Sequence, residues 1–260
     1  MQLRVGRNNM YRGFNIKGIE IKNKRLYDLG YAQSVKHNEA IAQKLNSFIL
    51  GNGKIDGTKM QSNWFPTIKA DIFLSHSHKD LDLAITLAGW LKDKFGLSTF
   101  IDSSVWGYSN NLLHQIDNDY CKIGDDLYSY DSRNFSTSHV HMMLASALTM
   151  MIDQAEILFF LNTPQSLSSD DIKQKTMSPW IYFELTTSRF IRKPIPDRLV
   201  PRVLNDSYKM AKTAGLDIEY TVDFSEFIEL EADQINEWAA KANVRGVDAL
   251  DSLYNMYPLD

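Results

Sequence analysis

Three short apolar runs are the strongest pattern along the chain. They lie within residues 70–75, 98–102 and 157–162, where the uninterrupted apolar centres are 72–74, 100–101 and 157–161, and each ends abruptly in polar residues. Continuous apolar character over so few residues is typical of strands that are buried on both faces of a parallel sheet. We predict these three strands, and two weaker ones at 199–200 and 218–222.

Between these runs, apolar residues recur at helical spacing. Residues 81–95 carry a broad apolar face that stops at Gly96, and the stretches 140–152 and 227–242 are also predicted to be helices. A strand, a helix and a second strand form one right-handed βαβ unit. The alternation therefore predicts an α/β fold, with a parallel β-sheet flanked by helices.

A further helix is predicted to begin at Ser178 and to run to about residue 192. Ser178 is a good N-cap, because its hydroxyl accepts a hydrogen bond from an unpaired backbone N–H. Pro179 follows at the first helical position, where its missing N–H is no loss. Trp180 and Glu184 lie four residues apart and therefore share a face.

The chain has 260 residues and divides near residue 66. Residues 1–66 start with a basic, irregular stretch and continue with amphipathic helical spacing, so we predict an N-terminal helical extension. Residues 67–260 are predicted to form the α/β domain, including a C-terminal helix. Within that domain, residues 103–138 are predicted to be a long polar loop with an embedded helix near 112–120.

Ligands of open parallel sheets bind outside the carboxyl ends of the strands. This rule gathers four groups: residues 73–78, 102–108 and 162–164, which follow the first three strands, and the helix start at 178–184. Glu184 has apolar neighbours in this cleft. It is therefore either a working carboxylate or the ion-pair partner of Arg189 or Arg192.

Three motifs in this order resemble the TIR (Toll/interleukin-1 receptor) domain family. They are the segment Phe73-Leu74-Ser75-His76-Ser77-His78-Lys79-Asp80, the strand end Phe100-Ile101-Asp102, and the spacing Trp180-x-x-x-Glu184 after Ser178. In TIR domains the first strand ends in a similar segment, and a later helix carries the catalytic glutamate of members that cleave NAD. The resemblance covers about residues 69–225 and implies a flavodoxin-like fold.

The resemblance implies that the chain cleaves the nicotinamide–ribose bond of NAD⁺, with NAD⁺ as the substrate and no bound cofactor. Glu184 is then the catalytic carboxylate. The residues expected to bind the substrate are Phe73, Ser75, His76, Asp102, Trp106, Tyr108 and Trp180. Phe73 and Trp180 could instead be core residues. Ser75 and His76 could instead cap a helix or form hydrogen bonds within the loop.

One carboxylate is enough for this reaction, because nicotinamide leaves as a neutral molecule without being protonated. Ordinary glycoside hydrolysis, by contrast, needs two carboxyl groups. The site must place negative charge near the developing ribosyl cation in a water-poor cleft. Capture by water gives ADP-ribose, and capture by another nucleophile gives a cyclic ADP-ribose, and both products stay open here.

A small TIR protein without a membrane span is similar to the bacterial TIR enzymes. That likeness implies a cytoplasmic protein that self-associates through TIR–TIR contacts. In antiphage defence of the Thoeris kind, such enzymes make a cyclic ADP-ribose signal for a separate effector. Two alternatives remain: a non-catalytic TIR interaction or scaffold module, and a flavodoxin-like or deoxyribosyltransferase-like domain that binds another nucleoside.

The composition of the chain limits the kinds of partner that we expect. The net charge of −4 argues against a general nucleic-acid binder. The most apolar stretch, 142–161, is interrupted by acidic residues, so we expect no membrane span. Cys121 is the only cysteine, which rules out an intramolecular disulfide and suits a reducing cytosol. The His-x-His pairs at 76–78 and 139–141 lack a third ligand at a zinc-binding spacing, so we expect no metal.

Overall fold

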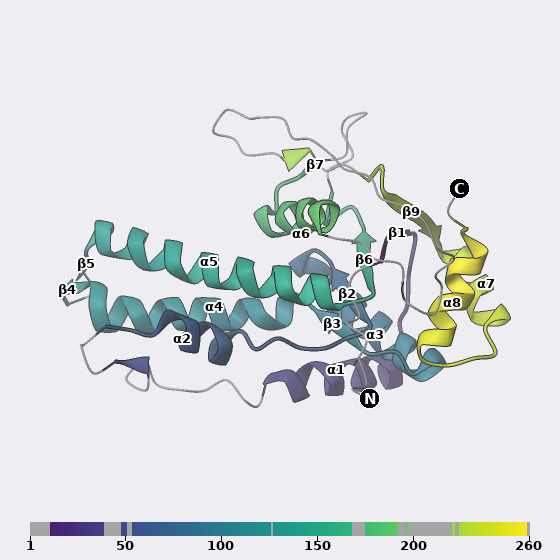
Figure 1. Ribbon diagram of the computed structural model, residues 1–260, viewed down its shortest axis with the longest axis horizontal. Coiled ribbons are helices and arrows are strands. Elements are labelled where there is room, and N and C mark those ends of the chain that lie inside the picture. The colour runs from purple at the N-terminus through teal and green to yellow at the C-terminus, as the bar shows by residue number, and fades with distance from the viewer. Residues whose placement is uncertain are drawn as a thin grey trace, which may run out of the picture.

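A five-stranded, all-parallel sheet forms the centre of the protein (Figure 1). Its strand order is β3-β2-β6-β1-β9. The strands are β1 (Arg12–Lys17), β2 (Ile72–Ser75), β3 (Thr99–Ile101), β6 (Ile157–Asn162) and β9 (Phe227–Glu231). The prediction of an α/β fold with a flavodoxin-like parallel sheet is confirmed, and so are the three strands expected from the uninterrupted apolar runs.

The computed structural model describes residues 11–38, 48–50, 54–125, 127–167, 175–191, 196, 220–221 and 224–258. Within these ranges, the side chains of 35–38, 104–108 and 220–221 lie outside the described set.

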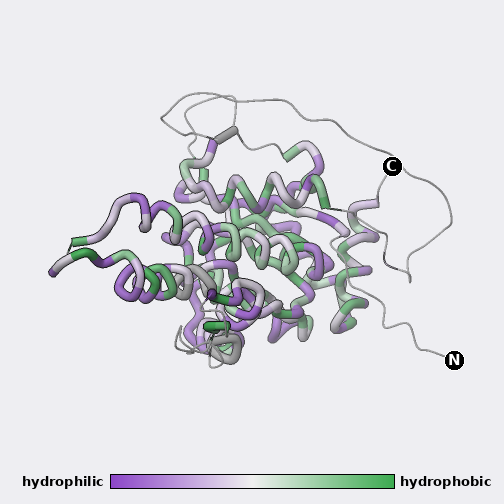
Figure 2. The backbone as a smooth tube through the Cα atoms, turned by 60° about the vertical axis from the view of Figure 1, so that its left-hand side comes forward, coloured by the Kyte–Doolittle hydropathy of each residue, from purple (hydrophilic) through white to green (hydrophobic). Residues whose placement is uncertain are grey.

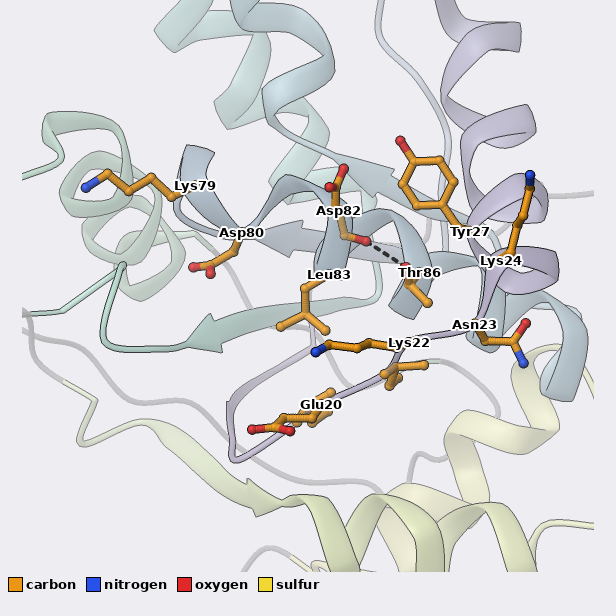
Figure 3. Close-up of a pocket in the computed structure, with 12 residues that line it drawn as sticks. Glu20, Lys22, Asn23, Lys24, Tyr27, Lys79, Asp80, Asp82, Leu83 and Thr86 are labelled. Carbon is orange, nitrogen blue, oxygen red and sulfur yellow. Dashed lines mark hydrogen bonds between the residues drawn. The ribbon is translucent and has the colours of Figure 1, made fainter.

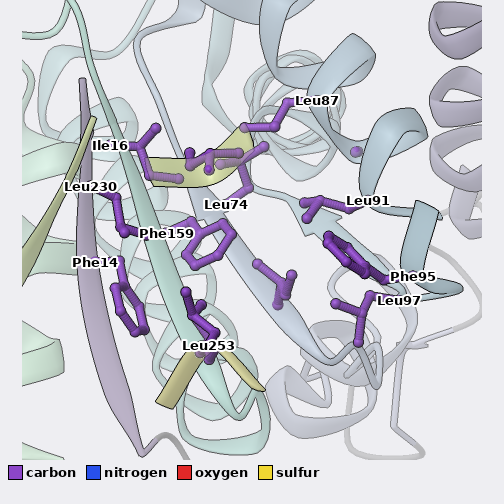
Figure 4. Close-up of a cluster of buried hydrophobic side chains, with 14 of the residues drawn as sticks. Phe14, Ile16, Leu74, Leu87, Leu91, Phe95, Leu97, Phe159, Leu230 and Leu253 are labelled. Atoms are coloured by element: carbon purple, nitrogen blue, oxygen red, sulfur yellow. The ribbon is translucent and has the colours of Figure 1, made fainter. Parts of the chain in front are cut away.

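Helices cover both faces of the sheet. One face packs against α3 (Leu81–Phe95), α7 (Ala232–Lys241) and α8 (Val247–Met256), and α1 (Lys24–Asn38) lies on α3. The other face packs against α2 (Gly57–Trp64), α4 (Ser103–Ile116), α5 (Tyr130–Gln154) and α6 (Pro179–Phe190). Alternate strand residues serve the two cores. Phe14, Leu74 and Phe159 point to the first (Figure 4), and Phe73 and Leu158 point to the second.

The N-terminal strand is the main departure from the prediction. β1 lies between β6 and β9 and pairs with both, so residues 12–17 belong to the sheet and residues 1–66 are not an appended extension. β1 is the fourth strand across the sheet, so the first strand of the chain stands where the flavodoxin-like order 2-1-3-4-5 has the fourth strand of the chain. The apolar pattern missed this strand because only Phe14 and Ile16 on one face are apolar. The other face carries Gly13, Asn15 and Lys17.

Two further predictions near the C-terminus need correction. The helix predicted at 227–242 starts as strand β9 and becomes helix α7 only at Ala232. Phe227 and Leu230 are its buried residues, and their spacing of three mimics a helix. The strand predicted at 218–222 is β8 (Tyr220–Thr221), which pairs antiparallel with β7 (Lys175–Thr176) outside the central sheet. The strand predicted at 199–200 lies outside the described residues.

The segment 103–138, predicted to be a loop, is mostly helical. After α4 come a π-helical turn (Asp117–Cys121), the hairpin of β4 (Lys122–Gly124) and β5 (Leu127–Tyr128), and then the first turns of α5. α4 and α5 run side by side as an arm that extends past the sheet (Figures 1 and 2). Asp117 joins the two helices by accepting hydrogen bonds from Arg133 Nε at 2.8 Å and from Ser136 Oγ at 3.1 Å.

Helices α1 and α3 touch backbone to backbone through two glycines. A Cβ added at Gly89 would lie 1.8 Å from the carbonyl oxygen of Leu26, and one at Gly30 would lie 1.9 Å from that of Ile85. Since neither carbonyl is at the end of a flexible side chain, the helices would have to separate to admit a methyl group. The glycines therefore set the distance between α1 and the helix that covers β1 and β2.

We predict that Gly89→Ala destabilises the protein by about 1–3 kcal/mol through this overpacking. Gly57→Ala is the control, because its added Cβ would meet only Met143 Cε, at 3.4 Å. Thermal unfolding of both variants checks the prediction. A Gly89→Ala protein as stable as Gly57→Ala would show that the close helix crossing is wrong.

Candidate functional site

Four polar side chains are buried together where strands β2 and β3 end. Ser75 and Glu184 are fully buried, and His76 and Asp102 are at least 98% buried. Ser75 is the last residue of β2, His76 follows it, Asp102 follows β3, and Glu184 comes from α6. We call these four residues the buried polar cluster. It lies at the carboxyl edge of the sheet, where ligands of open α/β folds bind.

Local backbone features place each member. Ser75 lies on the same face of β2 as Phe73, two residues earlier, and this face looks toward α5 and α6. Asp102 is the N-cap of α4, and one of its carboxyl oxygens accepts a hydrogen bond from Ser103 N at 2.7 Å. Ser178 caps α6 in the way the sequence predicted, accepting from Ile181 N at 3.2 Å. That cap fixes the start of α6.

The main electrostatic contact of the cluster is the pair formed by His76 and Asp102. His76 Nδ1 lies 2.7 Å from Asp102 Oδ1. Burial is the largest single influence and lowers the pKa of His76. The charge and hydrogen bond of Asp102, the backbone of Leu74 and the charge of Asp80 together outweigh burial, so the pKa of the imidazole is raised above its ordinary value. This shift favours the protonated imidazole beside Asp102.

Glu184 is the unusual member. Its pKa is raised well above the ordinary value, first because it is fully buried and then because Asp102 places a negative charge nearby, while the Ser75 hydroxyl opposes the shift in part. The groups that act on Glu184 are thus Asp102 and Ser75 rather than Arg189, and Arg192 lies outside the described residues. The raised pKa favours the neutral form of Glu184 in the ligand-free protein.

Polar atoms at this edge lack a hydrogen-bond partner within the described part of the chain, including His76 Nε2 in the cluster and Ser103 Oγ beside it. The carboxyl group of Glu184 has Ser75 and Asp102 as its polar neighbours. A buried polar group without a partner costs about 1–3 kcal/mol, so each one calls for a physical reason. A bound ligand that supplies the missing partners is such a reason.

The other residues expected to bind substrate lie differently. Phe73 is fully buried, and its ring packs against Phe100 with centroids 5.3 Å apart, so it forms the core beneath Ser75. Trp180 is half-buried and meets His141 of α5 edge to face at 5.6 Å. The side chains of Trp106 and Tyr108 lie outside the described residues.

Two polar residues at the same edge were not among the predicted site residues. Ser103 follows Asp102, and its buried hydroxyl has no partner among the described residues. Asn162 ends β6, and its buried side-chain nitrogen likewise has none there. Both positions fall in the strand-end groups 102–108 and 162–164 that the sequence places in the cleft, but neither was predicted to bind substrate.

A cavity of about 560 Å³ lies between the segment that follows β1 and the start of α3 (Figure 3), and none of the four cluster residues lines it. Lys22, Asp80 and Asp82 are among its lining residues. Asp80 ends the short 3-10 helix His78–Asp80 and accepts a hydrogen bond of 2.5 Å from Thr163 Oγ1. The same aspartate helps to raise the pKa of His76, so the cavity wall and the cluster are electrostatically linked.

Two further cavities are also lined by residues outside the cluster. One, of about 610 Å³, borders the outer side of α6 near Tyr182, and another, of about 910 Å³, lies between α2 and the arm. Cys121 borders the cavity between α2 and the arm. It is buried, and burial raises the pKa of its thiol. Among the described residues there is no group of three or more His, Cys, Asp or Glu that could hold a metal ion.

Comparison of the chain with family models, with curated proteins and with solved structures gave no match. In the part of the chain that the structure describes, no helix is long and apolar enough to cross a membrane. The functional argument therefore depends on the geometry of the cluster and on the motifs in the sequence.

The raised pKa of Glu184 predicts how stability changes with pH. An unfolded chain ionises Glu184 near 4.5, whereas the folded protein keeps it protonated to higher pH. The contribution of Glu184 to stability is thus fully present below pH 4.5 and is lost as pH rises through the folded pKa.

We therefore expect the wild type to lose stability relative to Glu184→Gln as pH rises from about 5 to 8. His76 titrates in the same direction in both proteins, so the difference between them isolates Glu184. Thermal unfolding of the pair across this pH range measures it. A constant difference would show that Glu184 is solvated and ordinarily ionised.

Proposed function

We propose that the protein is a TIR-type enzyme that cleaves the nicotinamide–ribose bond of NAD⁺. The products are nicotinamide and either ADP-ribose or a cyclic ADP-ribose. The observation that carries the proposal is the burial of Glu184 beside the His76–Asp102 pair, at the carboxyl edge of the sheet. The TIR-like motifs supply these same residues, which are far apart in the sequence.

The chemistry requires negative charge beside a cation. In NAD⁺ the bond from ribose C1′ to the ring nitrogen breaks, and its electron pair neutralises the pyridinium. The ribosyl centre that remains is positively charged. Asp102 is the charged acceptor in the cluster, and Glu184 becomes a second one if it ionises. Fixed negative charge in a buried site stabilises such a centre more strongly than the same charge in water.

A cationic substrate also changes the ionisation of Glu184. The pyridinium charge near the carboxyl group favours its anion and offsets the effects of burial and of Asp102. Substrate binding then releases the Glu184 proton, and the carboxylate forms when the reaction needs it. Water, or a nitrogen of the adenine ring, adds to C1′ to complete the reaction, and water loses a proton in doing so.

His76 has a supporting role in this scheme. Its Nδ1 holds Asp102 in place at 2.7 Å, and its buried Nε2 has no partner among the described residues. As an N–H donor, Nε2 suits a ribose or phosphate oxygen. Because all four members are buried, the substrate reaches them only if neighbouring groups move, so binding includes a conformational step.

A scaffold function without turnover is the second candidate, and the tip of the arm favours it. Large apolar side chains are strongly exposed there: Tyr120, Ile123, Leu127, Tyr130 and Phe135. Exposed apolar patches of this kind mark interaction sites (Figure 2 shows the projecting arm). Self-association is compatible with both functions. For the enzyme, we place it in the cytoplasm, in antiphage defence, where its product would signal to a separate effector.

We predict that purified protein releases nicotinamide from NAD⁺ and that Glu184→Gln lowers the rate by about 100-fold or more, since it removes the charge in the water-poor site. Liquid chromatography measures nicotinamide, and mass spectrometry separates linear from cyclic ADP-ribose. The matched control is Glu237→Gln, which makes the same change at an exposed helix position.

A Glu184→Gln protein that turns over like the control would remove Glu184 from the mechanism. A wild-type protein that is silent, including after assembly at high concentration, would favour the scaffold function instead.

A further inference from the structure

Asn15 is a buried side chain that the fold does not explain. It lies in the middle of β1 and is fully buried, yet neither its amide oxygen nor its amide nitrogen has a hydrogen-bond partner among the residues that the structure describes. An unpartnered amide disfavours folding, whereas an apolar residue of similar size would pack there without that penalty.

The register of the sheet places Asn15 on the same face as the buried polar cluster. Its neighbours in β1, Phe14 and Ile16, point into the core under α3, α7 and α8 (Figure 4), so Asn15 points to the face under α6. Phe160 of β6 is in register with Asn15 on one side and with Ser75 on the other. Ser75 and Asn15 thus lie in one row, two strands or about 10 Å apart.

The next row toward the carboxyl edge is also polar. Asn162 is in register with Lys17, and the Asn162 amide nitrogen is buried without a partner. Lys17 is occupied by an ion pair with Glu229 of β9. Two amide side chains with unsatisfied hydrogen-bonding atoms therefore stand on β6 and β1, on the α6 face.

We propose that Asn15 binds the carboxamide of the nicotinamide ring, an inference that rests on the proposed function. An asparagine amide offers one donor group and one acceptor, and a primary carboxamide presents the complementary pair. The fully buried side chain of Phe160 stands between Ser75 and Asn15 in this row. With the ribose hydroxyls at Glu184 and Ser75, the pyridine ring therefore reaches Asn15 only by lying across the Phe160 ring or by displacing it. The N-terminal strand then supplies the specificity for the leaving group.

The donor–acceptor edge of adenine has the same chemistry, since asparagine also pairs with the N6 and N7 edge of that base. The position of Asn15 favours nicotinamide, because a single strand, β6, separates it from Ser75 of the cluster that holds the scissile bond. Binding of free nicotinamide and of adenosine, each measured alone, distinguishes the two sources.

The test compares wild type with Asn15→Leu, and uses Asn110→Leu, at an exposed position of α4, as the control. Calorimetric titration with free nicotinamide needs no turnover. We expect Asn15→Leu to weaken nicotinamide binding at least 10-fold and to raise Tm by about 2–4 °C, because a costly buried amide has been removed. A drop in Tm, or unchanged nicotinamide affinity, would overturn the proposal.

A second measurement remains valid if that variant is unstable. In wild type, 3-acetylpyridine should bind more weakly than nicotinamide, because a methyl group replaces the amide donor. Asn15→Ser, a smaller polar change, should remove most of that preference, which is the coupling expected for a direct contact. Equal preference in both proteins would exclude contact with the carboxamide, and so would a wild type that binds no nicotinamide at millimolar concentration.

The two proposals fail in different ways. Nicotinamide binding that depends on Asn15, without NAD⁺ turnover, supports the subsite and contradicts the enzyme. Turnover that depends on Glu184 but ignores Asn15 supports the enzyme and contradicts the subsite. Loss of adenosine binding alone in Asn15→Leu would overturn the assignment to nicotinamide.

Discussion

The contact between His76 and Asp102 is the interaction on which the candidate site depends. Two buried carboxyl groups, those of Asp102 and Glu184, lie near each other, and both cannot carry charge there without a large desolvation penalty. The His76 imidazole lies 2.7 Å from Asp102, where its protonated form compensates a negative charge on the carboxylate. The raised pKa values of His76 and Glu184 both favour a low net charge in this buried volume.

The charge of the cluster can change when a ligand binds. Any positive charge that approaches Glu184 favours its ionisation, so the cluster responds most strongly to a cationic ligand. The surrounding structure is suited to hold it still: N-caps fix the starts of α4 and α6, and an aromatic core of Phe73 and Phe100 supports it from below. A preorganised site of this kind needs little rearrangement of its own dipoles when charge develops.

The sequence predicted the elements whose residues are apolar on both faces, and missed those that have one polar face. β2, β3 and β6 are buried throughout, so their runs stand out. In β1, Gly13, Asn15 and Lys17 interrupt the pattern, and the strand looked like part of a basic arm. The cluster members Ser75, His76, Asp102 and Glu184 were predicted together, because they follow strand ends or a helix cap.

The sequence pattern did not show how deeply each side chain is buried. Helical or strand spacing tells which residues share a face, but not how far each one lies from solvent. Phe73 was expected in the pocket and lies wholly in the core, and Trp180 was expected beside the ribose and meets His141. Both depend on how closely α5 and α6 approach the sheet, which is a tertiary property.

The sequence missed strand β1, and the amide of Asn15 is unexplained by the fold, for the same physical reason: β1 has one polar face. β1 bridges β6 and β9, so without it β9 would have no partner in the sheet and β6 would keep an open edge. A strand under such structural demand would be expected to be apolar on both faces. Instead β1 keeps a polar face toward α6, in the same row as Ser75. On that face Lys17 pairs with Glu229 and Gly13 admits the Phe227 ring, so among the described residues of that face Asn15 alone has no role in folding, and a binding role for the N-terminal strand rests on it.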